Sequence, residues 1–230
     1  MTHAPTVLPR FGTWSMLVHG APVLERFAGA GLDFIRLDME HTPVDDAVVA
    51  RLVREAENLP IDICLRPASA RPVDLERALA TGARRLCVPQ VETAQLARSI
   101  VETVSRLLPG DASVHLAVML ESPEAFQNCE AIAGVEGIDL LVIGPADLAQ
   151  ELGISGTPDE EEKLDKYRYL LAEAAIKHGK PWEIGVWTEE SALRWAGEGC
   201  PVLVYMTDTS ALQACYAPAM AEMDRLANGG

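Results

Sequence analysis

Side chains able to do acid–base or metal chemistry follow a series of short apolar runs in this sequence. Asp38, Glu40 and His41 follow one such run. Later runs are followed by Arg66, Gln90, Glu121, Asp147, Trp187 and Asp208, and Trp14 lies inside the first run. If the runs are parallel strands, their carboxyl ends meet at one edge of the sheet, which would bring these side chains together. The recurrence at run after run therefore predicts one site at that edge.

Two of these residues carry carboxylates at successive run ends. Taken alone, Glu121 could cap a helix that starts at Pro123, and Asp147 could belong to a turn. Together they predict a site for a hard cation, because such ions commonly take one or two carboxylates and leave other positions to water and substrate. We expect Mg²⁺ or Mn²⁺, with Co²⁺ or Zn²⁺ as alternatives.

The arginine and the histidine in this set each need an explanation. A buried guanidinium at Arg66 requires an anion, either a structural carboxylate or a carboxylate or enolate of a substrate. His41 lies three residues after Asp38. A carboxylate in that position could orient one imidazole tautomer and make it a general base, although a lone histidine is more often structural.

The composition excludes several classes of function. The 230 residues include 34 acidic and 19 basic side chains, which gives a formal net charge of −15. This charge repels phosphate backbones and anionic lipid, so we expect no nucleic-acid or membrane partner. No apolar run approaches the roughly 18–20 residues of a membrane helix. The first residues lack a secretion signal and the five cysteines are scattered, so we expect a cytoplasmic protein with reduced thiols.

The elements that would position the site alternate regularly along the chain. The predicted strands are residues 11–18, 33–39, 61–66, 85–91, 114–120, 140–144, 183–187 and 202–206. The predicted helices are residues 23–30, 45–59, 72–80, 94–108, 123–133, 160–178, 189–196 and 211–226. Eight strand–helix pairs in 230 residues correspond to about 29 residues each, which is close to the size of one βα unit.

This alternation favours one architecture over another. Short, continuously apolar strands are typical of a parallel sheet that is buried on both faces. Because no linker divides the chain, we predict a single domain over residues 1–230, a (β/α)8 TIM barrel of minimal length. A doubly wound open sheet is the alternative. The absence of a G-x-G-x-x-G motif after the first strand argues against it.

The run ends also resemble those of a known family. Gly-Thr-Trp-Ser at 12–15, Leu-Asp-Met-Glu-His-Thr-Pro at 37–43, Leu-Arg-Pro at 65–67, Leu-Glu-Ser at 120–122 and Ile-Gly-Pro-Ala-Asp-Leu at 143–148 are similar to motifs of the HpcH/HpaI aldolase family. This family comprises class II, metal-dependent pyruvate aldolases that act on 4-hydroxy-2-oxo acids. The resemblance implies a homo-oligomer, typically a hexamer built from dimers that exchange the last helix, here about residues 211–226.

The resemblance also implies roles for individual residues. Glu121 and Asp147 would be the metal ligands, and Glu40 would hydrogen-bond a metal-bound water. Arg66 would hold the keto or enolate oxygen of pyruvate. A cation together with this arginine would place positive charge where an enolate develops, which is what cleavage of a carbon–carbon bond beside a carbonyl requires.

The remaining roles concern the proton and the substrate. His41, oriented by Asp38, would be the acid/base that handles the proton of the C4 hydroxyl. The backbone N–H groups of Ala146 and Asp147 would receive the pyruvate carboxylate. Trp14 and Gln90 are further candidates for substrate binding.

We therefore expect a carbon–carbon lyase that cleaves or forms a 4-hydroxy-2-oxo acid, with an aldehyde as the other reactant, through a metal-bound pyruvate enolate. No lysine lies at a run end, which disfavours a Schiff base. The Arg-Gly-rich segment that family members usually carry before the fifth strand is missing, so we expect an altered substrate pocket.

Two other functions stay open. The first is an enzyme of the citrate-lyase-β or malyl-CoA-lyase type, which uses a CoA thioester enolate. The charge of −15 argues mildly against it, because a CoA site needs basic residues for the phosphates. The second is a non-catalytic, oligomerising or regulatory barrel. Such a barrel has no physical need for the six polar residues Asp38, Glu40, His41, Arg66, Glu121 and Asp147 together.

Overall fold

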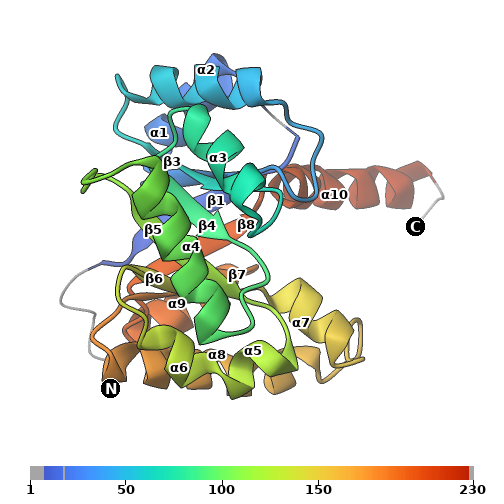
Figure 1. The fold of residues 1–230 in the computed structure, drawn as a ribbon. Coiled ribbons are helices and arrows are strands. Elements are labelled where there is room, and N and C mark those ends of the chain that lie inside the picture. The colour runs from blue at the N-terminus through green and yellow to red at the C-terminus, as the bar shows by residue number, and fades with distance from the viewer. Residues whose placement is uncertain (1–7, 18, 228–230) are drawn as a thin grey trace.

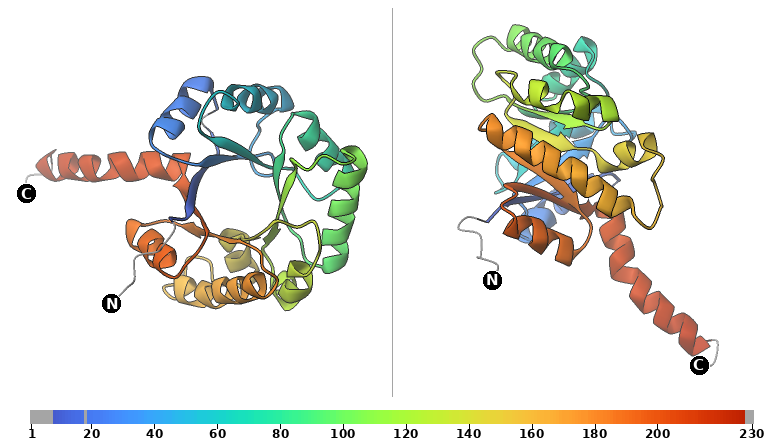
Figure 2. Two further views of the ribbon diagram at one scale, coloured as in Figure 1. Left: turned by 90° about the vertical axis from the view of Figure 1, so that its left-hand side faces the viewer. Right: turned by 90° about the horizontal axis from the view of Figure 1, so that it is seen from below.

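Eight parallel strands follow one another around a closed barrel, with helices outside it (Figures 1 and 2). The computed structural model describes residues 8–17 and 19–227. The strands are β1 (Arg10–Ser15), β2 (Phe34–Asp38), β3 (Asp62–Arg66), β4 (Arg85–Val88), β5 (His115–Leu120), β6 (Leu140–Ile143), β7 (Trp182–Val186) and β8 (Val202–Thr207). Pairing of β8 with β1 closes the barrel. The predicted (β/α)8 barrel is confirmed, and the open sheet is excluded.

Helices follow every strand. They are α1 (Ala21–Gly29), α2 (Asp46–Ala56), α3 (Pro72–Ala80), α4 (Ala94–Leu107), α5 (Pro123–Gln127), α6 (Cys129–Ala133), α7 (Pro145–Glu151), α8 (Glu160–Lys177), α9 (Glu189–Gly197) and α10 (Asp208–Ala227). The connection from α4 to β5 is only residues 108–114, so the chain has no long excursion before the fifth strand. Among the described residues, no helix combines the length and apolarity needed to cross a membrane.

Two local predictions were wrong, and one helix was not predicted. The predicted strand 11–18 ends at Ser15, because the N–H groups of Met16 and Leu17 donate to Asp208 rather than to a strand, at 3.0 and 3.1 Å. Val18 lies outside the described residues. The predicted helix 123–133 is two short helices separated at Asn128. Helix α7 was not predicted, although the proline at its first position is a typical helix start.

Apolar side chains form two separate cores. The larger core lies between the strands and the surrounding helices and includes Leu37, Leu65 and Leu141. The smaller core lies inside the barrel. Its members are Phe34, Cys64, Cys87, Ala117, Met119, Leu140, Val142, Val202 and Val204, with Trp14 packed against them.

A fully buried ion pair crosses the interior of the barrel. Arg36 on β2 donates to both carboxylate oxygens of Glu183 on β7, at 2.5 and 2.7 Å, and the two side chains are 1% and 2% exposed. The guanidinium carbon lies 5.0 Å from the ring centroid of Trp14 and 5.8 Å from that of Phe34. Burial of either charge without the other is costly, so the pair holds the two strands in one arrangement.

Helix α10 points away from the barrel (Figure 2). Its first residue, Asp208, is buried, but every side chain from Ala211 to Leu226 is exposed. Most helices in proteins are stabilised by packing of one face, and Pro218 inside α10 lowers its stability. Among the described residues, the part of the helix from Ala211 onward lacks such packing.

We predict that Glu183→Ala destabilises the fold by about 3–5 kcal/mol, because it leaves the charge of Arg36 buried and unpaired. Urea unfolding followed by circular dichroism measures the free energy of unfolding. Glu198→Ala, which breaks the exposed pair with Arg194, is the matched control and should cost less than about 1 kcal/mol. The double variant Arg36→Met/Glu183→Leu should recover much of the loss. A double variant as unstable as Glu183→Ala would contradict the charge argument.

Candidate active site

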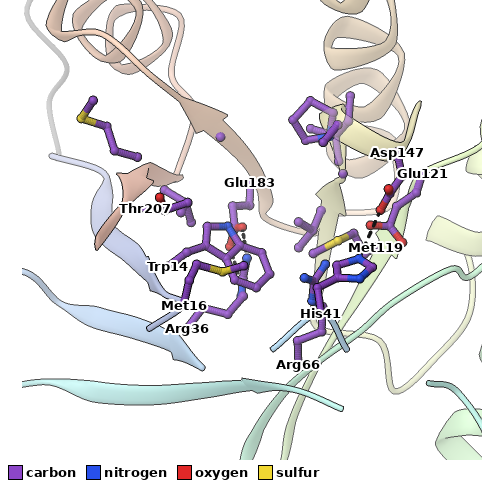
Figure 3. Close-up of a pocket in the computed structure, with 18 of the residues that line it drawn as sticks. Trp14, Met16, Arg36, His41, Arg66, Met119, Glu121, Asp147, Glu183 and Thr207 are labelled. Carbon is purple, nitrogen blue, oxygen red and sulfur yellow. Dashed lines mark hydrogen bonds and ion pairs between the residues drawn. The ribbon is translucent and has the colours of Figure 1, made fainter. Parts of the chain in front are cut away.

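A cavity of about 780 Å³, open to solvent, lies at the carboxyl ends of the strands (Figure 3). Trp14, His41, Arg66, Glu121, Ala146 and Asp147 line it, so the cavity brings together six of the nine predicted site residues. The buried pair Arg36–Glu183 also lines this cavity. The other three predicted residues, Asp38, Glu40 and Gln90, contact lining residues from outside it.

Arg66 is held by two carboxylates. Its Nε and Nη2 each donate to Asp38 at 2.8 Å, and its Nη1 lies 3.1 Å from Glu40 Oε2. The register of β2 against β3 places Asp38 beside Arg66, and the Trp14 ring centroid lies 4.4 Å from the guanidinium carbon. The sequence left open whether the anion beside Arg66 is a carboxylate of the protein or of a substrate. In the structure a protein carboxylate, that of Asp38, fills this position.

Asp38 is fully buried and stays ionised. Besides Arg66, it accepts the backbone N–H groups of Glu40 and His41, at 2.9 and 3.3 Å. Burial alone would raise the pKa of Asp38, but the hydrogen bonds and charge of Arg66 outweigh it and hold the pKa below its ordinary value. The carboxylate therefore fixes the loop that carries His41.

The predicted contact between Asp38 and the imidazole of His41 is wrong. The Asp38 oxygens are taken by Arg66 and by backbone N–H groups, so they hold the main chain of His41 instead of its ring. The ring Nε2 lies 3.6 Å from Glu40 and 3.8 Å from Asp147, and the side chain is 48% exposed. The imidazole thus lies at the cavity mouth between two other carboxylates.

Glu121 is a buried carboxylate with few partners. It is 4% exposed, and its Oε2 accepts the backbone N–H of Gln90 at 2.8 Å. Burial raises its pKa to about 7, and the charges of Glu40 and Asp147 act in the same direction. A Cβ at Gly144 would lie 2.3 Å from Glu121 Oε1, so only glycine leaves room for this side chain.

Gln90 donates hydrogen bonds to both Glu121 and Glu40. Its φ of 54° is in the left-handed region, which is unusual for a residue other than glycine. This conformation accompanies the bond from its N–H to Glu121, and its side-chain amide donates to Glu40 Oε1 at 2.7 Å. Strained backbone of this kind clusters at functional sites. Gln90 was predicted to bind substrate, and the structure gives its amide a protein partner.

The carboxylates fit a divalent cation. Glu121 is desolvated, and Asp147 lies beside it on the same side of the cavity (Figure 3). Glu40 Oε2 is buried without a hydrogen bond, since its contact with Arg66 has ion-pair distance but not hydrogen-bond direction. Among the described residues, no group of three or more His, Cys, Asp or Glu side chains is arranged to hold a metal.

The opposite side of the cavity carries two apolar side chains close to the buried pair Arg36–Glu183 (Figure 3). Trp14 and Met16 lie across from His41 and Glu121 (Figure 3). Trp187 also lines the cavity, and Met206 does so from a left-handed φ of 57°. The sequence did not identify Met16, Met119, Met206 and Thr207 as lining residues. A methionine in or beside an apolar strand is indistinguishable in the sequence from a residue of the hydrophobic core, and Thr207 belongs to no motif. The strain at Met206 gives no signal in the sequence.

Residues 10–192 match the model of the HpcH/HpaI aldolase/citrate lyase family. The chain belongs to this family. It is 31% identical to the 4-hydroxy-2-oxo-heptane-1,7-dioate aldolase of Salmonella typhimurium over 178 residues, which cover 67% of each protein. It is 34% identical to the 4-hydroxy-2-oxovalerate aldolase of Novosphingobium aromaticivorans over 199 residues, covering 75% of this chain and 74% of that enzyme.

Solved structures agree with this assignment. An HpcH/HpaI aldolase/citrate lyase family protein from Burkholderia cenocepacia superposes with a TM-score of 0.83 at 28% identity, covering 94% of this chain and 95% of the other. The citrate synthase SbnG superposes with a TM-score of 0.84 at 24% identity, covering 96% and 95%. The second likeness concerns the fold alone. The family and the named relatives identify an enzyme of the aldolase or lyase type.

We predict that Asp38→Asn costs about 3 kcal/mol of unfolding free energy at neutral pH, because Arg66 loses a buried ionic partner. The folded pKa of Asp38 is lowered, so its contribution is complete above the ordinary Asp pKa and fades as the pH falls. The difference between wild type and variant should therefore shrink below about pH 4. Urea unfolding from pH 7 to pH 3 measures it, with Asp46→Asn at an exposed ion pair as the control. A difference that stays constant to pH 3 would rule out this ionic role.

Proposed function

We propose that this protein is a metal-dependent aldolase that cleaves or forms a 4-hydroxy-2-oxo acid. One observation carries the proposal: an arginine, two carboxylates and an exposed imidazole converge on one cavity at the carboxyl end of the barrel. The named activities of relatives, among them a hydroxypyruvate/pyruvate aldolase of Sagittula stellata that is 30% identical, support a 2-oxo acid as substrate. An aldehyde would be the other reactant.

Glu121 and Asp147 would hold the cation, which we propose to be Mg²⁺ or Mn²⁺, with Co²⁺ or Zn²⁺ as alternatives. The desolvation that raises the pKa of Glu121 is offset when a positive charge lies beside it, so this carboxylate favours a cation. When bound, the metal would act as a Lewis acid beside the 2-oxo group. Gln90 would keep Glu121 and Glu40 in place through its two hydrogen bonds.

Arg66 would stabilise the negative charge that develops on the keto oxygen as the carbon–carbon bond breaks. Asp38 takes the N–H of Nε and one N–H of Nη2, so further N–H groups on Nη1 and Nη2 stay available for substrate. The two hydrogen bonds to Asp38 would keep the guanidinium of Arg66 oriented before the substrate binds. Such preorganisation is the main source of electrostatic stabilisation in enzymes.

His41 would move the proton of the C4 hydroxyl. Its ring lies at the mouth of the cavity, where solvent and an aldehyde both have access, and Glu40 and Asp147 lie within 3.8 Å of Nε2. The first backbone N–H groups of α7, at Ala146 and Asp147, would receive the substrate carboxylate, since such groups have no acceptor within their helix. Trp14 would cover the face of Arg66.

The alternatives have less support. An enzyme using a CoA thioester needs basic side chains for phosphates at the mouth. Among the described lining residues, both arginines are already paired with carboxylates inside the barrel. A non-catalytic barrel has no use for a buried, poorly partnered Glu121 or for strain at Gln90.

We also propose that residues 1–230 form one domain and that α10 docks on a second copy of the chain. The helix carries a stripe of exposed apolar side chains at spacings of three and four residues: Leu212, Tyr216, Met220, Met223 and Leu226. One face of a helix with this spacing fits an apolar surface. The family resemblance points to dimers that exchange this helix within a hexamer. The five free cysteines support a reducing compartment such as the cytoplasm.

The metal proposal is tested by following exchange of the C3 protons of pyruvate into D₂O by NMR. Exchange should require Mg²⁺ or Mn²⁺, stop in EDTA, and fall by about 10²-fold or more in Glu121→Gln. Glu124→Gln changes an exposed side chain three residues later, on α5; it is the matched control and should exchange like wild type. Exchange that persists in EDTA or in Glu121→Gln would refute the proposal.

The oligomer proposal is tested on α10 itself. Met220→Asp places a charge in the apolar stripe and should shift the protein toward smaller species in analytical ultracentrifugation, because burial of an unpaired carboxylate is costly. Ala221→Asp changes the adjacent residue, outside the stripe, and should leave the oligomer intact. Equal behaviour of the two variants would show that the stripe is not an interface.

A further inference from the structure

The barrel interior is also hollow at its other end. A second cavity, of about 700 Å³ and open to solvent, lies where the strands begin. Its lining is Arg10, Phe34, Arg36, Cys64, Arg85, Leu86, His115, Ala117, Leu140, Pro181, Glu183, Pro201 and Val202. Barrels of this fold are normally filled by layers of side chains, and their active sites lie at the carboxyl end. This amino-terminal pocket therefore needs its own explanation.

The buried pair Arg36–Glu183 separates the two cavities. Both side chains line the active-site cavity and the amino-terminal pocket, so the pair is the floor of one and the roof of the other. Beneath it, Cys64 and Ala117 are too small to fill the space. The pocket is thus a compartment distinct from the active site.

Positive charge gathers at the mouth of this pocket. Arg10 on β1 and Arg85 on β4 converge on a single oxygen, Asp62 Oδ2, at 2.6 and 3.0 Å. One carboxylate thus serves two guanidiniums, and His115 lies beside Arg85 in the register of β4 and β5. The charge of Asp139 also influences the pKa of His115, but its carboxylate accepts the backbone N–H of Leu116 and does not line the pocket. The lining of the pocket at its mouth thus contains two arginines and no carboxylate, an arrangement that favours an anion.

The rest of the lining is apolar. Phe34, Leu140 and Val202 belong to the inner core, and Leu86 and two prolines complete the wall. An inorganic anion such as phosphate would leave its oxygens against this apolar surface without partners. A neutral apolar molecule would leave the extra guanidinium charge unmatched. The lining therefore fits a molecule with both an anionic group and an apolar body.

We propose that the amino-terminal pocket binds a small organic monocarboxylate with an apolar body. The carboxylate pairs with Arg85 and Arg10 at the mouth, and the body fills the space beneath Arg36 and Glu183. This site is separate from the aldolase site and does not depend on the reaction proposed above.

Benzoate is the probe, titrated by isothermal calorimetry and by NMR of the histidine rings. Wild type should bind benzoate saturably and bind neither benzyl alcohol nor phosphate with comparable affinity. Arg85→Gln should weaken binding about tenfold, because it removes a charge-assisted hydrogen bond. Arg84→Gln, whose parent side chain pairs with Asp111 outside the pocket, is the matched control and should bind like wild type.

The NMR measurement locates the ligand without any variant. Benzoate in the amino-terminal pocket should shift the ring signals of His115 and leave those of His41 unchanged. Absence of saturable binding would overturn the proposal, as would equal affinity for benzyl alcohol. Shifts at His41 with none at His115 would place benzoate in the active site and would also overturn it.

Discussion

The ion pair between Arg36 and Glu183 determines what the interior of this barrel can contain. Two opposite charges that are almost completely excluded from water must stay together, and they join strands on different sides of the barrel. The aromatic rings of Trp14 and Phe34 lie against the guanidinium from within the inner core. The pair takes the place of the apolar layer that a barrel of this fold usually has at that level.

Above this pair, the active-site cavity contains more negative than positive groups. Asp38 and Glu40 share the charge of Arg66. Among the described residues, Asp147 has only the ring of His41 at ion-pair distance, and Glu121 has no cationic side chain at that distance. Burial raises the pKa of Glu121 to about 7, and the nearby charges of Glu40 and Asp147 add to this effect. The chemistry of the site is therefore set by which charges are already neutralised within the protein and which are left for a cation and a substrate.

The sequence predicted the architecture and the edge at which the site lies, because strand periodicity and the order of βα units are local properties. It also identified six residues that line the cavity. It did not predict the orientation of the side chains. Asp38 turns toward Arg66 because of the register of β2 and β3, and Arg36 meets Glu183 across 147 positions of sequence. The first contact depends on the pairing of two strands and the second on closure of the barrel, and neither is a property of a local stretch of sequence.

Asp208 links the start of α10 to the segment that follows β1. Its carboxylate accepts the N–H groups of Met16 and Leu17 after β1, and the residue itself begins α10. Met16 is part of the cavity rim. The start of α10 and the cavity rim at Met16 are thus held by the same carboxylate. A displacement of α10 would therefore act on the segment that carries Met16, at the rim of the cavity.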